Sequence, residues 1–187
     1  MSIYSFYENA PSQTTVASGD IIPLIDGTTK ALKQVLVSAI GNSTASAVQV
    51  TAGATTLTVT QALHGNSVIV LANTAPIAIT LPQATGTGTM YKFQIAVAAT
   101  ATSSTIKVAN ATDVMQGIVV ALTTSSANVI GYGTSATSDT ISLNGTTLGG
   151  VVGDIIKIQD VKTGFFAVEM LTSPTGTTAT PFSASVS

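Results

Sequence analysis

The sequence predicts an all-β protein, an antiparallel β-sandwich or jelly-roll-like knob that carries an extended N-terminal arm. Three observations support this fold class. Short segments of alternating apolar and polar residues recur roughly every 8–12 residues, Gly, Pro and Asn separate them, and strands do not alternate with helices. From the change in composition we expect two parts: residues 1–45, an arm and linker, and residues 46–187, a β-rich knob domain.

The first part begins with three aromatic residues in a segment too short to build a core. Tyr4, Phe6 and Tyr7 precede a polar run that contains proline. Aromatic side chains are enriched at interfaces, so we expect these three to dock on another surface, the alternative being a frayed terminus.

The rest of the arm contains one extended piece and at most one short helix. In residues 19–26, Pro23 excludes a central strand. Residues 28–40 have apolar residues at helical spacing, although Val35 and Val37 suit a strand equally well. Residues 41–47 have the Gly, Ser and Thr composition of a linker.

The clearest strand signals lie between Asn66 and Val97. Residues 68–71 form an unbroken apolar run, as expected of a strand buried on both faces. Two further segments alternate with a period of two, with these residues on the core face: Ile77, Ile79 and Leu81, then Tyr91, Phe93, Ile95 and Val97. We interpret this stretch as a β-meander in which residues 105–109 pair with residues 91–97.

Further strands are expected at residues 117–122, 128–132 and 140–143, and Asn144-Gly145 predicts a hairpin turn. Residues 154–159 and 165–171 predict a second hairpin, which places these residues on its core face: Ile156, Ile158, Phe166, Val168 and Met170. The opposite row includes Ile155, Phe165 and Leu171. A short strand within residues 182–186 is expected to close the domain.

The composition argues against several functions. Only 7% of the residues are charged, against about 25% in ordinary soluble domains, and the net charge is −2. A chain with no basic surface is not expected to bind nucleic acid, and it has no polybasic membrane anchor. The N-terminus resembles no signal peptide, and no apolar run approaches the length of a membrane span. We expect a chain with so little charge either to hide its surface in an assembly or to stay in solution through rigid, Thr-rich β faces.

Motifs for catalysis, cofactors or metals are not found. The chain has no Cys, and its one histidine, His64, has no acidic neighbour in sequence, so we interpret it as a structural turn residue. The acidic residues beside Gly or Thr are expected to bond to backbone in turns: Asp113, Asp139, Asp154 and Asp160. A calcium site from Asp154 and Asp160 is an alternative without the spacing of a known loop. We predict a protein that is not an enzyme and has no cofactor.

Several stretches resemble structural proteins of tailed bacteriophages. They are SVIVLANTAPIAITLPQATGTG, MYKFQIAV, KVANATDVMQG, SDTISLNGTTLGGVVGDIIKIQDVKTGFFAVEML and ATPFSASVS, within residues 48–187, and IPLIDGTTKALKQV in the arm. The knob resembles head decoration (cement) proteins and head-fibre proteins, and the arm resembles attachment regions of phage fibres. The resemblance implies a homotrimeric knob on the capsid exterior, with an arm that grips the major capsid protein.

The expected function is therefore that of a virion structural protein that binds and cements the outer surface of a phage capsid. The expected capsid-binding residues are Tyr4, Phe6 and Tyr7, with Ile21, Ile22 and Leu24 as secondary contacts. The alternative for each is packing on its own β domain. The alternative function is that of a phage fibre or a host-surface (glycan) binding protein, which the absence of Trp makes less favoured.

Overall fold

The computed structural model describes residues 21–25, 32–36, 47–50, 54–100, 103–123 and 128–186. The chain divides into two compact units, Met1–Ala45 and Ser46–Ser187. In the first unit, β1 (Ile21–Ile25) pairs antiparallel with β2 (Leu32–Leu36) in a two-stranded sheet. The helix predicted over residues 28–40 is wrong at β2, where the β-branched Val35 fits the strand that the same residues also suit.

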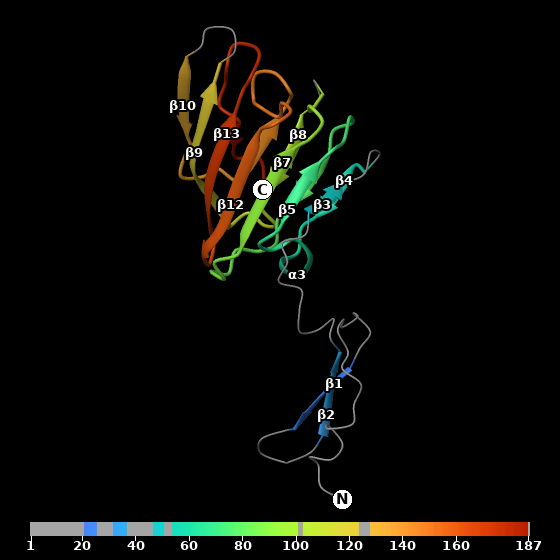
Figure 1. The fold of residues 1–187 in the computed structure, drawn as a ribbon. Helices are drawn as coiled ribbons and strands as arrows, with labels where there is room; N and C mark the ends of the chain where they lie inside the picture. Colours follow the sequence, from blue (N-terminus) through green and yellow to red (C-terminus); the bar gives the residue numbers. More distant parts are fainter. Residues whose placement is uncertain are drawn as a thin grey trace, which may run out of the picture. The chain divides into compact units, whose positions relative to one another are not determined.

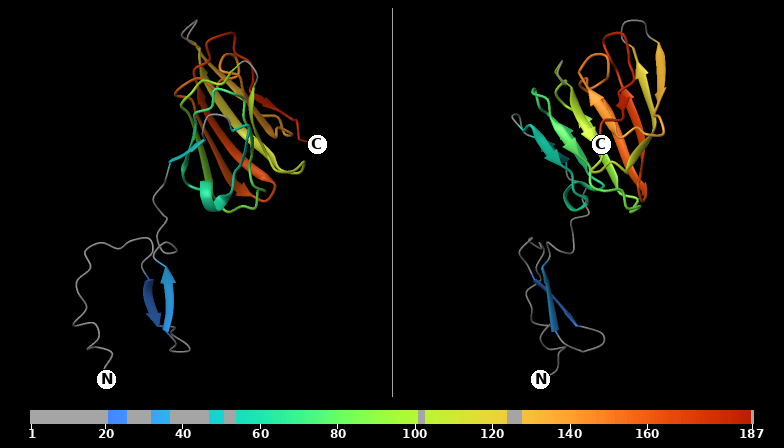
Figure 2. Two further views of the ribbon diagram at one scale, coloured as in Figure 1. Left: turned by 90° about the vertical axis from the view of Figure 1, so that its right-hand side faces the viewer. Right: turned by 180° about the vertical axis from the view of Figure 1, so that it is seen from behind.

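The second unit contains two packed β-sheets (Figures 1 and 2). The larger sheet has the strand order β10 (Val129–Gly133), β9 (Val114–Leu122), β13 (Phe165–Thr172), β12 (Ile155–Lys162), β7 (Met90–Ile95), β5 (Val68–Leu71) and β3 (Ala47–Val50). The smaller sheet has the order β14 (Phe182–Ser183), β11 (Thr140–Leu143), β8 (Ser104–Lys107), β6 (Ala78–Thr80) and β4 (Thr56–Thr58). A short helix, α3 (Gln61–His64), connects β4 to β5.

Strands β3 to β8 alternate between the two sheets. Each strand crosses to the opposite sheet and the next one returns, so that β3, β5 and β7 are parallel neighbours, as are β4, β6 and β8. The predicted meander is therefore wrong, and so is the pairing of residues 105–109 with residues 91–97, because β8 pairs with β6 and β11. A period of two identifies strands and faces but not the sheet to which a strand belongs.

The second half of the unit is built mainly from antiparallel pairs. The predicted hairpin of β12 and β13 is confirmed, and Gly164 adopts the left-handed φ of 77° that its turn requires. The hairpin predicted at Asn144-Gly145 is wrong, because this loop connects β11 of the smaller sheet to β12 of the larger one. There the Asn144 side chain accepts bonds from the backbone of Thr146 and Leu148 instead.

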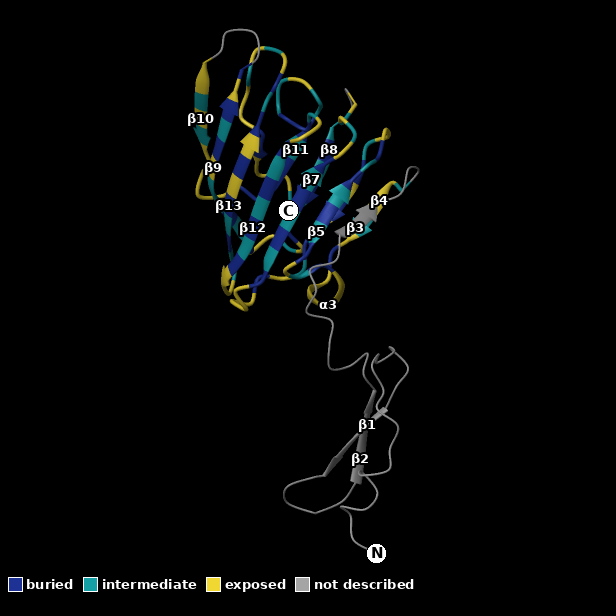
Figure 3. Cartoon of the chain, viewed as in Figure 1, coloured by how far each residue is buried: buried dark blue, intermediate teal, exposed yellow. Residues whose placement is uncertain are grey.

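The core lies between the sheets and contains the residues that the alternating patterns predict, except Val97, which follows the end of β7 and is only half-buried (Figure 3). Ile77, Ile79 and Leu81 are buried, and the predicted core face of β12 and β13 is buried along its whole length. Burying one such side chain contributes about 1.5–3 kcal/mol. Strand β5 differs from prediction: Ile69 and Leu71 are buried, but Val68 and Val70 are half-buried on the outer face.

The all-β fold with two packed sheets is confirmed. The sheets are mixed, however, since β13 also runs parallel to β9, and the strictly antiparallel arrangement is not observed. Among the described residues, no helix is long and apolar enough to cross a membrane.

Candidate interaction surface

The outer face of the larger sheet points away from the core. Every second residue of β12 and β13 lies there, and the register places Ile155 beside Leu171 and Lys157 beside Glu169. The outer row predicted from the sequence, with Ile155, Phe165 and Leu171, is thus observed. Lys157 and Glu169 form an exposed ion pair of 3.0 Å between Nζ and Oε2.

Large apolar side chains gather on this face toward β10. Exposed fractions are 56% for Ile118, 51% for Leu122, 67% for Val129 and 45% for Leu171. The register places Val129 beside Leu122, and Leu171 beside the half-buried Val120. We call these five residues the apolar patch. Scattered exposed hydrophobic residues are ordinary, but a contiguous group of them marks an interaction surface.

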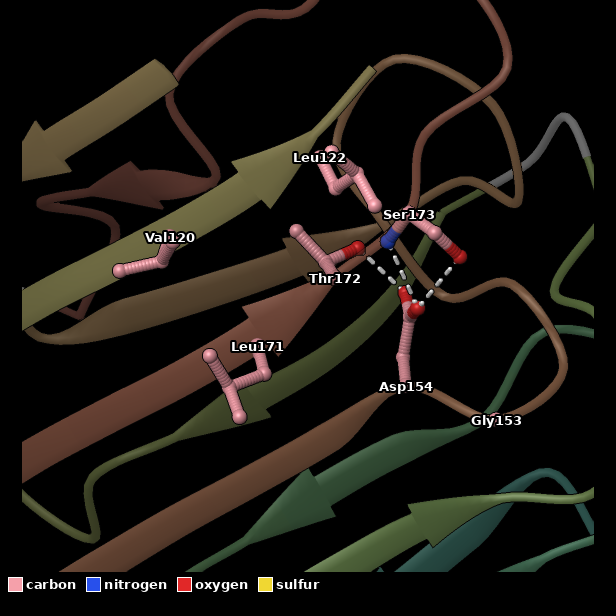
Figure 4. A pocket seen from close by; sticks show the side chains of 7 residues that line it. All are labelled: Val120, Leu122, Gly153, Asp154, Leu171, Thr172 and Ser173. Carbon is pink, nitrogen blue, oxygen red and sulfur yellow. Dashed lines mark hydrogen bonds between the residues drawn. The ribbon is translucent and has the colours of Figure 1, made fainter. Parts of the chain in front are cut away.

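A shallow depression of about 240 Å³ lies at one end of the apolar patch (Figure 4). It is lined by Val120, Leu122, Gly153, Asp154, Leu171, Thr172 and Ser173. The valine and the two leucines form its apolar side. On its polar side, the Asp154 carboxylate accepts hydrogen bonds from the Thr172 hydroxyl and from the Ser173 backbone N–H, which is 2.9 Å away. Since that carboxylate is already bonded, the depression suits an apolar side chain better than a cation.

The predicted turn role of the aspartates is confirmed for all four. Each is buried and accepts backbone N–H groups from a loop. Asp154, for example, also accepts the N–H of Gly150 at 2.8 Å, and Asp113 accepts the N–H of Ala84 at 2.9 Å. Asp139 holds the end of the described chain through the N–H of Ser185 at 2.8 Å. Asp113, Asp139 and Asp160 thus hold segments far from them in sequence, and Asp154 holds both its own loop and Ser173.

Asp160 binds the loop between β6 and β7 most extensively. Its carboxylate accepts the N–H groups of Gly86 at 2.7 Å and of Thr85 and Thr87 at 3.1 Å, together with the Thr87 hydroxyl at 2.8 Å. Burial alone would raise the pKa of Asp160, but the hydrogen bonds from Thr87, Gly86 and Thr85 outweigh it and hold the pKa below its usual value. Burial, and then the charge of Asp160, raises the pKa of the neighbouring Tyr91.

The structure does not bring Asp154 and Asp160 together as a calcium site. They lie at opposite ends of β12, and each carboxylate bonds its own loop. Over the ranges that the structure describes, no group of three His, Cys, Asp or Glu residues is placed to hold a metal ion.

His64 has the local structural role predicted for it. The side chain is buried, and its Nδ1 lies 3.0 Å from the backbone nitrogen of Thr60, whose N–H it accepts at the start of α3. This bond satisfies one of the donors that a helix N-terminus leaves without a partner.

The predicted capsid-binding residues fall in the first unit. Tyr4, Phe6 and Tyr7 lie outside the described residues. Ile21, Ile22 and Leu24 lie in β1, but the description there is limited to the backbone. Their role in binding stays a prediction.

Sequence reasoning missed the apolar patch. The signal was the run of residues 117–122, GIVVAL, which is apolar at consecutive positions and therefore places Ile118, Val120 and Leu122 on the face opposite the core.

Comparison with known proteins does not assign this chain to a family: no family model, curated protein or solved structure matches it.

Proposed function

We propose that this protein is a virion structural protein that binds the outer surface of a phage capsid and stabilises it through residues 1–45. The observation that supports this most is the contrast between the two units. Residues 46–187 have a core of their own, whereas the described part of residues 1–45 is one two-stranded sheet. An isolated two-stranded sheet is marginally stable in water, so a partner surface is expected to complete it.

The proposed mechanism is mass action. A protein that binds the assembled shell but not its separated subunits stabilises the shell in proportion to its occupancy. The partner is the major capsid protein, and the site is the capsid exterior. The homotrimer implied by the resemblance stays a prediction; in such an assembly, several arms would bind with a high effective concentration.

Two further features support this proposal. The sequence resembles phage decoration and head-fibre proteins over residues 48–187 and in the arm, and only 7% of its residues are charged. In the second unit, the four aspartates are buried against loops, so their carboxylates are occupied by structural bonds. The described side chains thus offer packing surfaces more than reactive groups.

The alternative, host-surface or glycan binding, has less support from the described residues. Sugar sites use exposed aromatic rings, but Tyr91 is buried and the Tyr132 hydroxyl donates to the Thr178 hydroxyl at 2.7 Å. Host-surface or glycan binding is therefore the function to test if the protein does not bind capsids.

The test is co-sedimentation of the purified protein with undecorated capsids of the phage that encodes it. Saturable binding is expected for the wild type. A triple variant with Tyr4, Phe6 and Tyr7 changed to Ala is expected to bind at least about ten-fold more weakly, with an unchanged melting temperature. The matched control changes three exposed apolar residues of the second unit to Ala: Leu63, Val152 and Val161.

Absence of wild-type binding contradicts the proposal, and a glycan array would then test the alternative. Equal binding by the aromatic variant removes these three residues from the interface. A loss of binding in the control variant alone would place the contact on the second unit.

A further inference from the structure

We propose that β10 pairs antiparallel with β10 of a second copy of this chain, so that the larger sheets of the two copies become continuous. Among the described strands, β10 is the last of the larger sheet, and its only partner is β9. Figure 1 shows it at the margin of the sheet, and Figure 3 shows that much of it is exposed. This inference concerns the free protein, does not depend on capsid binding, and is an alternative to the homotrimer that the resemblance implies.

The bonds between β9 and β10 identify the backbone groups that remain for a partner. At the two ends of the pair, Thr134 donates to the Gly117 carbonyl at 3.1 Å and Thr123 donates to the Asn128 carbonyl at 2.9 Å. Antiparallel pairs alternate between bonded and non-bonded positions. The intervening non-bonded positions of β10 therefore turn their N–H and C=O groups to the free edge: Val129, Gly131 and Gly133.

Among the described residues, this edge lacks lysine, proline and a bulge, three of the devices that protect edge strands from pairing. Natural edge strands carry lysine, proline or a bulge, or are covered by other chain segments. Strand β10 has the sequence VIGYG, pairs with β9 in unbroken register, and has glycines at two of its three free positions. A Cβ added to Gly133 would meet no atom within 4 Å, so the outer face of the sheet at this residue has room for a side chain of a partner strand.

The edge is complementary to itself. If two copies pair about a two-fold axis at Gly131, Val129 of each copy lies opposite Gly133 of the other, and the free N–H and C=O groups meet in bonded pairs. Val129 is 67% exposed, and Gly133, which has no side chain, leaves room for it beside Ile118, which is 56% exposed. The pairing thus covers two exposed apolar residues as well as the backbone.

Charge and symmetry favour a second copy as the occupant. Strands β9 and β10 contain no charged residue, so two identical edges meet without repulsion. A two-fold contact uses the same surface on both copies and closes after two, whereas pairing with an unrelated strand would leave Val129 without its complementary glycine. The apolar patches of the two copies then form one larger surface on the same side of the joined sheet.

The test is the mass of the full-length protein by sedimentation equilibrium over about 1 µM to about 1 mM. The wild type is expected to be a dimer at the upper end of this range. Val129→Lys places like charges at the junction between the two copies. Gly131→Pro removes an N–H that faces the free edge and does not bond β9. Each variant is expected to weaken the dimer at least about ten-fold. The matched control is Leu63→Lys, an equally exposed apolar position on α3 (71%), which is expected to dimerise like the wild type.

Hydrogen exchange gives a second measurement that needs no variant. The amides of Val129, Gly131 and Gly133 are expected to exchange more slowly as concentration rises, and an exchange rate that does not change with concentration contradicts the proposal. A monomer at every concentration contradicts it as well, and so does a dimer or trimer whose mass is unchanged in both β10 variants. If Gly131→Pro fails to fold by circular dichroism, Val129→Lys decides.

Discussion

The described parts of the two units of this protein differ in architecture. The second unit closes a core between two sheets and holds its loops with buried aspartates. The described part of the first unit is a single pair of strands, β1 and β2. Two strands without a packed face are marginally stable. We therefore expect changes in the second unit to alter the free energy of unfolding, and changes in the first unit to alter the proposed binding to capsids.

The largest effect on stability is expected from Asp154→Ala. This change leaves the buried N–H of Gly150, the buried Thr172 hydroxyl and the half-buried N–H of Ser173 without their acceptor, at a cost of up to about 1–3 kcal/mol each. We expect a loss of about 3–5 kcal/mol in the free energy of unfolding, measured by urea denaturation. The control Glu169→Ala removes an exposed acid and should cost less than about 1 kcal/mol. Equal losses would show that Asp154 does not hold these loops.

Gly117→Ala is expected to have the next largest effect. A Cβ at this position would lie 1.8 Å from the Val168 carbonyl oxygen of the neighbouring strand, so β9 and β13 must separate. Such overpacking costs about 1–3 kcal/mol. At Gly131, an added Cβ would meet only the Val119 carbonyl oxygen at 3.8 Å, and Gly131→Ala should change the melting temperature little. A stable Gly117→Ala variant would contradict the observed approach of the two strands.

A smaller, pH-dependent effect is expected from Asp160. Its pKa is lower in the folded protein than in the unfolded chain, so its contribution to stability is present above the unfolded value of about 3.9 and is lost as the pH falls through the folded value. The free energy of unfolding should decrease between about pH 5 and pH 2 by a larger amount in the wild type than in Asp160→Asn. If the free energy of unfolding of the two proteins changed equally with pH, Asp160 would not contribute to the pH dependence of stability.

The smallest effect is expected from the ion pair of Lys157 and Glu169. The two side chains are 39% and 56% exposed, and solvent screens most of their attraction. A double-mutant cycle with Lys157→Ala and Glu169→Ala should give a coupling of less than about 1 kcal/mol. A larger coupling would mean that this part of the outer face is shielded from water, as in an interface.

The sequence predicted the strands of the second unit better than their arrangement. Alternation identified Tyr91 and Phe93, or Ile156 and Ile158, as core residues because a strand places alternate side chains on opposite faces. This alternation of apolar and polar residues is the same whether the next strand in the chain pairs with the preceding strand or crosses to the other sheet. The crossing between β5 and β6 was therefore missed.

The candidate surface was predicted only in part. The outer position of Leu171 followed from the pattern of the hairpin. Val129 became a neighbour of Leu122 through the pairing of β9 with β10, and Leu171 a neighbour of Val120 through the pairing of β9 with β13, and no local pattern contains these pairings. The role of the aspartates was predicted from their neighbours in sequence, whereas most of the segments that they bind lie far along the chain. For Asp160 and Gly86 the contact spans 74 residues.

The most direct test of the contrast between the two units is deletion of residues 1–45, with melting temperature and capsid co-sedimentation measured on the same preparation. We expect the remaining chain to unfold cooperatively at a temperature within a few degrees of the full-length value, because its core and its buried aspartates are intact. We also expect it to bind no capsids. A chain that no longer folds, or one that still sediments with capsids, would contradict the assignment of stability to the second unit and binding to the first.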